Sequence, residues 1–272
     1  MAKKSKVIEV PDIRMVRPLV YHDKATKKSI TVQRLEIFDI KNCEISFAAP
    51  NNVSIFASIA HKELQQSKTL YSNIIKKNLK KGGRLEIKGK DLTRFYNYLE
   101  HVQMSIIAIY TAIESFANLA IPKDFEKSVL NTKGIKEIWD KKAIERHWKT
   151  SDKIGDILPE VLQSESPKTL SDWSNFKSLE SIRNDIIHQK TAPKKEQGNL
   201  KVDSGFVHKL LDEKIFELIE SGFSLISFFC KKDISHAYFP MGFSEANLKP
   251  IEVEDFTDSF KLYRKADEGE DE

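Results

Sequence analysis

The sequence predicts a mainly α-helical fold, in which a helical bundle follows a smaller N-terminal α+β segment. Apolar residues recur at helical spacing from Asp91 onward, whereas the first ninety residues carry short runs of β-branched and aromatic residues. Of the 272 residues, 40% are hydrophobic and 31% are charged, which is ordinary for a soluble globular protein. We therefore expect a mixed α+β segment at residues 1–90, a helical bundle at 91–235 and an irregular C-terminal segment with an acidic tail at 236–272.

The N-terminal segment has the composition of strands followed by a helix. Residues 31–40 and 44–48 are rich in β-branched and aromatic side chains and predict two strands. Residues 51–79 predict a helix, with a less regular pattern. Two glycines at 82–83 interrupt the chain, and residues 84–88 predict another short strand.

One long amphipathic helix dominates the pattern that follows. Asp91 is a good N-cap residue, and the helix is expected to end near Pro122. Its apolar residues recur at three- and four-residue spacing: Leu92, Phe95, Leu99, Val102, Ile106, Ile109, Ile113 and Phe116. A narrow seam of this kind is what helical bundles and helical dimers bury.

The rest of the bundle is predicted from the same periodicity. Three shorter helices are expected at residues 124–131, 135–149 and 154–162. Pro159 interrupts the third of these. A further helix begins near Ser171 and ends before a loop marked by Pro193 and Gly198, and a second long helix is expected at 204–231.

Composition also limits the cellular setting and the chemistry. The basic start of the chain continues without a long apolar region, so no signal peptide is expected. The longest apolar run, residues 223–230, is too short to span a bilayer. Cys43 and Cys230 form no metal pattern, and no paired-histidine motif, nucleophile elbow or phosphate-binding glycine loop is present. We expect a cytoplasmic protein with no metal, no cofactor and no membrane partner.

The most informative stretch lies at residues 181–190. Five apolar side chains fall on one broad side of the predicted helix: Phe176, Leu179, Ile182, Ile186 and Ile187. Arg183 falls inside this apolar arc, and Asn184 and His188, four residues apart, stack on its edge. Because a buried guanidinium is costly unless an anion meets it, this helix is a candidate catalytic surface.

Arg183, Asn184 and His188 resemble the signature of the HEPN superfamily of helical bundles. That signature is an arginine, usually followed by a polar residue, with four to six residues before a histidine. Residues 143–159 are similar to the region that precedes the motif, and residues 110–118 are similar to the long partner helix. The resemblance covers roughly residues 91–231. It implies a metal-independent ribonuclease that acts as a homodimer in toxin–antitoxin or anti-phage defence, with an antitoxin or companion defence protein as a possible partner.

The residues themselves justify RNA cleavage. RNA carries its own nucleophile, the 2′-hydroxyl, so cleavage needs a base, an acid and positive charge at the phosphorane. An imidazole can accept or donate a proton, so His188 suits either proton-transfer role, whereas Arg183 offers planar donors to phosphate oxygens. Asn184 would hydrogen-bond His188 or the substrate. A two-fold dimer would supply the second histidine.

Lysines beyond the motif are candidate substrate-binding residues. Lys190, Lys194 and Lys195 follow His188 closely and would attract a phosphate backbone. Lysine pairs are also common on solvated faces without a binding role. The net charge of +4 is modest and does not decide between the two.

Structural explanations compete with the catalytic one. An imidazolium in the last turn of a helix is favoured by the helix dipole, which is sufficient to explain His188. Arg183 would then form an ion pair with Glu180 or with Glu114 of the long helix. Glu114 is either an ordinary polar flank or a supporting residue that holds Arg183 or polarises His188. The alternative for the whole chain is a non-catalytic helical module that dimerises or binds a partner through the seam from Leu92 to Phe116.

Overall fold

A computed structural model of the chain describes residues 12–79, 85–188, 195–197, 200–202, 207–231, 239–243 and 251–254. The chain divides into two compact units, one formed by residues 1–54 with 230–272 and the other by residues 55–229. These limits differ from the expected boundaries after residues 90 and 235, because the first helix belongs from residue 55 onward to the helical unit. The fold is mainly α-helical, with a smaller part that contains strands.

The smaller unit contains a three-stranded sheet. β1 (Leu19–Asp23) lies in the centre, with β2 (Ser29–Val32) antiparallel to it and β9 (Ile251–Val253) parallel to it. The C-terminal segment was expected to be irregular, and for residues 251–253 this expectation is wrong. A strand of three residues is too short to show a period in the sequence. The acidic tail lies outside the described residues.

A separate hairpin follows β2 in the sequence. β3 (Leu35–Ile40) and β4 (Cys43–Ala48) pair antiparallel through a two-residue turn. Lys41 and Asn42 in this turn have φ values of 51° and 64°, the left-handed backbone of the mirror-image turn that suits the twist of paired strands. The second expected strand is confirmed, and the first, at residues 31–40, is divided into β2 and β3.

The helix predicted at residues 51–79 is confirmed as one continuous helical run. It consists of α1 (Asn52–Tyr71), a π-helical segment η1 (Ser72–Lys76) and α2 (Lys77–Leu79). Residues 85–88 have no regular structure, so the strand predicted there is wrong for the described residues.

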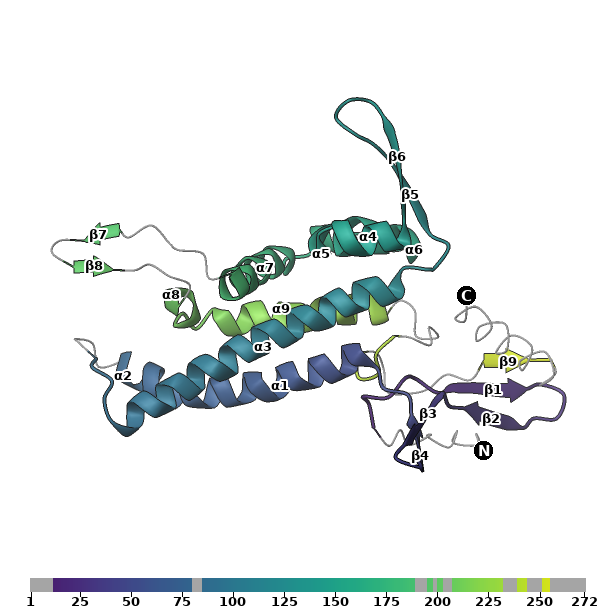
Figure 1. The fold of residues 1–272 in the computed structure, drawn as a ribbon, viewed down its shortest axis with the longest axis horizontal. Coiled ribbons are helices and arrows are strands. Elements are labelled where there is room, and N and C mark those ends of the chain that lie inside the picture. Colours follow the sequence, from purple (N-terminus) through teal and green to yellow (C-terminus); the bar gives the residue numbers. More distant parts are fainter. Residues whose placement is uncertain are drawn as a thin grey trace, which may run out of the picture. The chain divides into compact units, whose positions relative to one another are not determined.

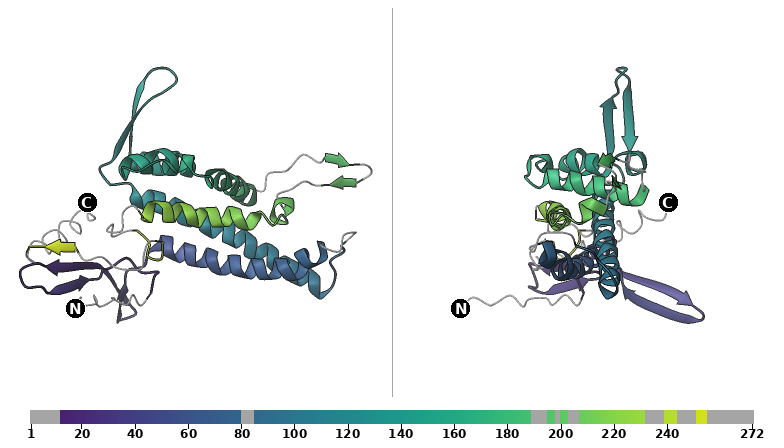
Figure 2. Two further views of the ribbon diagram at one scale, coloured as in Figure 1. Left: turned by 180° about the vertical axis from the view of Figure 1, so that it is seen from behind. Right: turned by 90° about the vertical axis from the view of Figure 1, so that its left-hand side faces the viewer.

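The long helix α3 (Lys90–Ala120) forms the centre of the bundle (Figures 1 and 2). Gly89, with φ of 56°, occupies the N-cap position, so Asp91 lies in the first turn instead of capping the helix. The seam from Val102 to Phe116 is at most 1% exposed at its apolar positions. By length and composition α3 would be able to cross a membrane, but 56% of its most apolar window is buried inside the chain. This burial is typical of the core helix of a soluble protein.

A hairpin replaces the first helix that the sequence predicted after α3. β5 (Glu126–Leu130) and β6 (Lys136–Asp140) pair antiparallel and project away from the helices (Figure 1). The helix expected at 124–131 is therefore wrong, and the helix expected at 135–149 exists only in its second half. Gly134 adopts a φ of 73° in the turn. Exposed and half-buried residues alternate along both strands, and neither strand has a buried face. The apolar residues themselves do not alternate with polar ones, so the sequence shows no strand pattern here.

A series of short helical segments follows in the sequence. They are α4 (Lys141–His147), α5 (Thr150–Asp152), the π-helical segment η2 (Lys153–Ile157), α6 (Leu158–Val161) and the 3-10 turn η3 (Pro167–Thr169). Asp140 caps α4, because its carboxylate accepts a hydrogen bond of 2.7 Å from the backbone N–H of Ala143. Pro159 lies in the first turn of α6, where its missing N–H costs little, so the helix predicted at 154–162 is confirmed.

The remaining elements of the helical unit are α7 (Trp173–His188), the strands β7 (Lys195–Gln197) and β8 (Leu200–Val202), α8 (Val207–Leu210) and α9 (Ile215–Cys230). The helix predicted to begin near Ser171 is confirmed as α7. The second long helix, predicted at 204–231, is divided into α8 and α9 around Asp212, whose side chain accepts a hydrogen bond from the backbone N–H of Lys214.

One glycine sets the spacing of the bundle. A Cβ atom added to Gly222 of α9 would lie 2.6 Å from Cγ1 of Ile109 and 3.4 Å from Cδ2 of Leu179. The missing side chain thus allows α9 to approach both α3 and α7 closely. The core that results supports the face of α7 on which the candidate residues lie.

Candidate functional site

The predicted apolar arc of α7 is largely confirmed. Phe176, Leu179, Ile182 and Ile186 are buried, and α7 packs against α3. Ile187, which was placed in the same arc, is 48% exposed. Arg183 therefore lies beside a buried face, at the border where a side chain is covered on one side and open on the other.

Arg183 is half-buried and held by two groups. Its guanidinium carbon lies 4.7 Å from the ring centroid of Tyr110 on α3, within the range of a cation–π interaction. Its Nη1 donates a hydrogen bond of 3.1 Å to Oδ1 of Asn184. In the described part of the chain Arg183 has no carboxylate partner, so the ion pairs considered with Glu180 and Glu114 are not formed. Most of its N–H donors remain available to a ligand.

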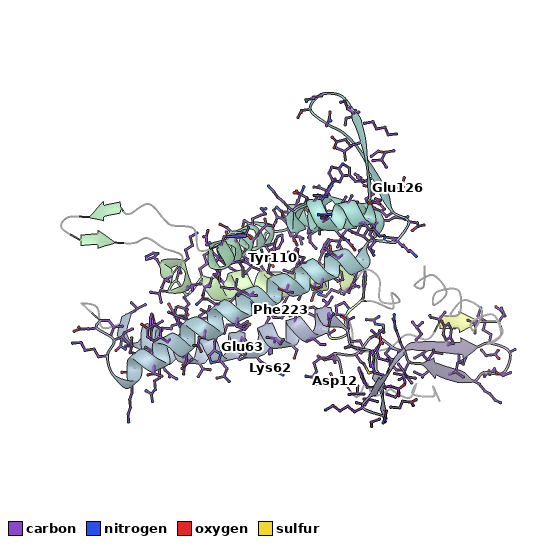
Figure 3. The ribbon with its side chains drawn as sticks, viewed as in Figure 1. Asp12, Lys62, Glu63, Tyr110, Glu126 and Phe223 are labelled. Atoms are coloured by element: carbon purple, nitrogen blue, oxygen red, sulfur yellow. The ribbon has the colours of Figure 1, made fainter. Side chains whose placement is uncertain are left out.

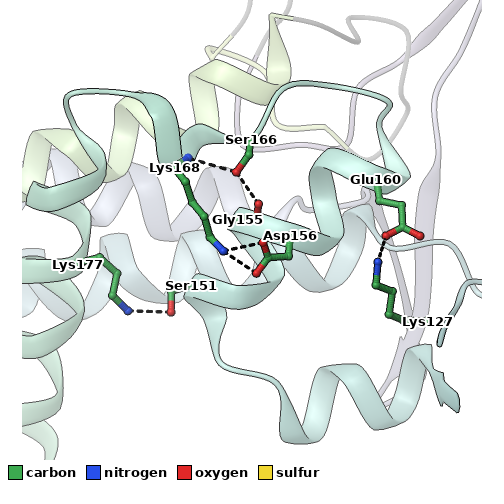
Figure 4. Close-up of polar contacts among 8 residues, drawn as sticks. All are labelled: Lys127, Ser151, Gly155, Asp156, Glu160, Ser166, Lys168 and Lys177. Atoms are coloured by element: carbon green, nitrogen blue, oxygen red, sulfur yellow. Dashed lines mark hydrogen bonds and ion pairs between the residues drawn. The ribbon is translucent and has the colours of Figure 1, made fainter. Parts of the chain in front are cut away.

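Glu180 has other partners. Its Oε1 accepts a hydrogen bond of 2.9 Å from the hydroxyl of Tyr110, and its Oε2 forms an ion pair with Nζ of Lys177. Lys177 Nζ also donates to the hydroxyl of Ser151 at 2.9 Å (Figure 4). Burial by itself would raise the pKa of Glu180, but the hydrogen bonds from Lys177 and Tyr110 outweigh it and lower the pKa. Glu180 is thus an ionised and well-satisfied carboxylate.

Tyr110 links Glu180 to Arg183. Figure 3 labels Tyr110, which belongs to α3, the helix that packs against α7. The residue is 4% exposed, and burial raises the pKa of its phenol, so the hydroxyl stays protonated and donates to Glu180. The ring of Phe176 stacks nearly parallel to it, with the centroids 6.5 Å apart.

Glu114 belongs to a different cluster. Burial lowers the pKa of the Lys153 ammonium group, and the negative charge of Glu114 opposes this effect only in part. Lys153 is 1% exposed and donates to Oδ1 of Asn118 at 2.8 Å and to the backbone carbonyl of Glu145 at 2.9 Å. Glu114 is therefore close enough to act on the charge of Lys153, and in the described part of the chain it forms no ion pair with Arg183, so the expectation that it holds Arg183 is wrong.

His188 is the last residue of α7, and its side chain is exposed. The side-chain carbonyl oxygen of Asn184 accepts a hydrogen bond from Arg183. The hydrogen bond considered between Asn184 and His188 is therefore replaced by one with the arginine. Asp185, on the same turn, pairs with Lys209 of α8 at 2.7 Å. The imidazole thus lies at an open helix end beside the Arg183–Asn184 pair.

The structure does not test the three candidate substrate-binding lysines. Lys190 and Lys194 lie outside the described residues. The backbone of Lys195 begins β7, but its side chain lies outside what is described. Among the described residues, no group of three His, Cys, Asp or Glu side chains is arranged to hold a metal ion.

Sequence reasoning missed the roles of Tyr110 and Lys177. Lys177 and Glu180 are three residues apart on α7, a spacing that places their side chains on one helix face. That spacing was a usable indication that Glu180 is paired with a lysine. Tyr110 is 70 residues from Glu180 in the sequence, and no local pattern reveals a contact over that separation.

Comparison of the chain with family models, with curated proteins and with solved structures found no match.

Proposed function

We propose that this chain is a metal-independent endoribonuclease of HEPN type, with Arg183, Asn184 and His188 at its site. The observation that most supports this function is the half-buried guanidinium of Arg183, which has no carboxylate partner in the described part of the chain. A cation held by an aromatic ring and an amide keeps donors free for the two oxygens of a phosphate.

The chemistry follows from the positions of these groups. The 2′-hydroxyl of RNA attacks the adjacent phosphorus, the bond to the 5′-oxygen breaks, and a 2′,3′-cyclic phosphate results. Arg183 stabilises the negative charge that develops on the phosphorane. The exposed imidazole of His188 accepts the proton of the attacking hydroxyl or donates one to the leaving oxygen. Because one imidazole cannot fill both roles at once, the active form is a homodimer that brings two motifs together.

The biological setting belongs to the same proposal. A ribonuclease of this kind acts in the cytoplasm as a toxin or in anti-phage defence, where an antitoxin or companion defence protein restrains or directs it. Lys190, Lys194 and Lys195 would attract the RNA backbone to the site. The buried character of α3 supports a soluble protein, which this setting requires.

RNA cleavage in the presence of EDTA tests the proposal. We expect His188→Ala to lower the cleavage rate by about 10²–10⁴-fold, the usual contribution of a positioned acid or base. The products of the wild-type protein should end in 2′,3′-cyclic phosphate, which mass spectrometry detects. The cleavage rate per chain should fall on dilution if two chains share one site.

His147→Ala is the matched control. His147 is exposed and is the last residue of α4, as His188 is the last residue of α7. Its loss should leave cleavage unchanged. Cleavage that persists in His188→Ala, or that EDTA abolishes in the wild type, would remove the assignment.

The alternative function, a non-catalytic helical module, depended on the seam of α3. The structure buries the apolar residues of that seam from Val102 to Phe116 against the chain's own helices. This part of the seam is therefore not available to a second copy or to a partner, whereas Leu92 at its start is 38% exposed. The burial from Val102 to Phe116 favours the nuclease over a module that binds through the whole seam.

A further inference from the structure

Glu180 is the carboxylate best placed to neutralise Arg183. It lies three residues earlier on α7, a spacing at which Glu and Arg side chains normally meet on a helix face. An arginine in such a pair presents fewer donors to a phosphate, and the carboxylate repels the incoming anion. The site avoids this pairing.

Two side chains occupy the oxygens of Glu180 instead. The hydroxyl of Tyr110 donates to Oε1, and Lys177 forms an ion pair at Oε2. Glu180 is 8% exposed, so these partners act where water competes little. Both oxygens of the carboxylate are therefore engaged by groups other than Arg183.

Tyr110 also determines where the guanidinium lies. Its ring supports the guanidinium of Arg183 at 4.7 Å, while its hydroxyl is bound to Glu180 at 2.9 Å. The same side chain thus contacts Arg183 with its ring and Glu180 with its hydroxyl.

We infer that Lys177 and Tyr110 are positioning residues, which hold the Glu180 carboxylate away from Arg183 so that the guanidinium stays free for an RNA phosphate. That Arg183 binds RNA rests on the proposed function. The positions of the Lys177, Tyr110, Glu180 and Arg183 side chains do not depend on it. Lys177 acts through Glu180 in this scheme, and its own contact with RNA is not required.

The test compares Lys177→Met with the double variant Lys177→Met/Glu180→Gln. The probe is a fluorescent, 2′-O-methylated RNA oligonucleotide, which the protein can bind but not cleave, and anisotropy measures its dissociation constant. Without Lys177 the ionised Glu180 turns to Arg183, and we expect binding to weaken about tenfold. Removing the charge of Glu180 in the double variant should restore binding to within about twofold of the wild type.

Lys209→Met is the matched control. Lys209 is 48% exposed and pairs with Asp185 of α7, whereas Lys177 is 44% exposed and pairs with Glu180. Asp185 is two residues from Arg183, so it does not face the guanidinium on the helix. Lys209→Met should weaken binding by less than about threefold, the general effect of one lost positive charge. Equal losses in the two lysine variants, or no recovery in the double variant, would overturn the inference.

An NMR measurement on the full chain separates this inference from the proposed function. With ¹⁵N-labelled arginine, the Nε–H resonance of Arg183, assigned by its loss in Arg183→Lys, should carry a ring-current shift from Tyr110. That shift should diminish in Lys177→Met and return in the double variant. It should also diminish in Tyr110→Phe, which keeps the ring but loses the hydroxyl that holds Glu180. A resonance unchanged by Lys177→Met refutes the positioning role. The expected shifts in a protein that binds no RNA would support the positioning role and refute the proposed function.

Discussion

Two cations beside α3 are held in opposite ways. Lys153 is buried, donates to Asn118 and to the carbonyl of Glu145, and lies near the charge of Glu114. Arg183 is half-buried, and of its guanidinium donors only Nη1 has a hydrogen-bond partner within the described part of the chain. The comparison teaches that burial alone does not identify a functional cation. Lys153 is satisfied by the fold, whereas Arg183 is supported by the fold and still able to bind an anion.

Arg183→Met gives the largest expected effect and tests the functional half of this comparison. It removes the donors but keeps an unbranched side chain against the Tyr110 ring. We expect cleavage of RNA to fall by about 10²–10³-fold, the usual cost of losing one group that stabilises the transition state. The melting temperature should change little, because no carboxylate partner loses its counter-ion. Single-turnover kinetics and a thermal melt measure the two quantities.

The opposite result would reverse the roles of the two cations. A variant that cleaves RNA normally but melts at a much lower temperature would make Arg183 a structural residue. A cation–π contact at a partly exposed position contributes about 0.5–2 kcal/mol. The proposal therefore allows Arg183→Met to lower the free energy of unfolding by no more than this amount.

Lys153→Met tests the structural half, with the next largest effect. The substitution keeps the length of the side chain but leaves Oδ1 of Asn118 and the carbonyl of Glu145 without a donor. Leaving buried acceptors unsatisfied costs about 1–3 kcal/mol of the free energy of unfolding. Urea unfolding followed by circular dichroism measures it. RNA affinity should stay within about twofold of the wild type, and a large loss of affinity at normal stability would show that Lys153 contacts the substrate.

The same two cations show how far the sequence alone can lead. Helical period placed Arg183 inside the apolar arc of α7, and the structure shows it half-buried at the border of that face. The prediction came this close because it depends only on neighbours along one helix. The partners of the two cations come from other elements. Glu114 was expected beside Arg183 and lies near Lys153, since the register of α3 against its neighbours depends on packing that no local pattern records.

The fold, like the site, was predictable where local sequence patterns determine it and not where long-range packing does. The boundaries of α3 were predicted to within about two residues, because its apolar seam repeats over about seven turns of an amphipathic helix. The β5–β6 hairpin was mistaken for helices, because its strands bury no continuous face and give no period-two pattern. The turn residues Asn131 and Gly134 were the available evidence for a hairpin, and the prediction of helices did not take them into account.

The pH dependence of stability gives the smallest expected effect and tests whether Glu180 is as well satisfied as Lys153. The pKa of Glu180 is lowered from its ordinary value of 4.5, because hydrogen bonds from Lys177 and Tyr110 outweigh the effect of burial. A carboxylate with a lowered pKa stabilises the fold above its ordinary pKa, and this stabilisation is lost as the pH falls through the lowered value. The difference in unfolding free energy between wild type and Glu180→Gln should therefore be constant above about pH 5 and shrink below it.

Tyr110→Phe sharpens this last measurement. It removes the hydroxyl that donates to Oε1 of Glu180 but keeps the ring beneath Arg183. With one hydrogen bond to the charged form lost, the pKa of Glu180 should rise, because burial is then opposed only by Lys177 and Ser151. The acid loss of stability should accordingly begin at a higher pH than in the wild type. A profile that does not move would mean that the Tyr110 hydroxyl is not needed to keep Glu180 ionised, and that Tyr110 serves only to support the guanidinium of Arg183.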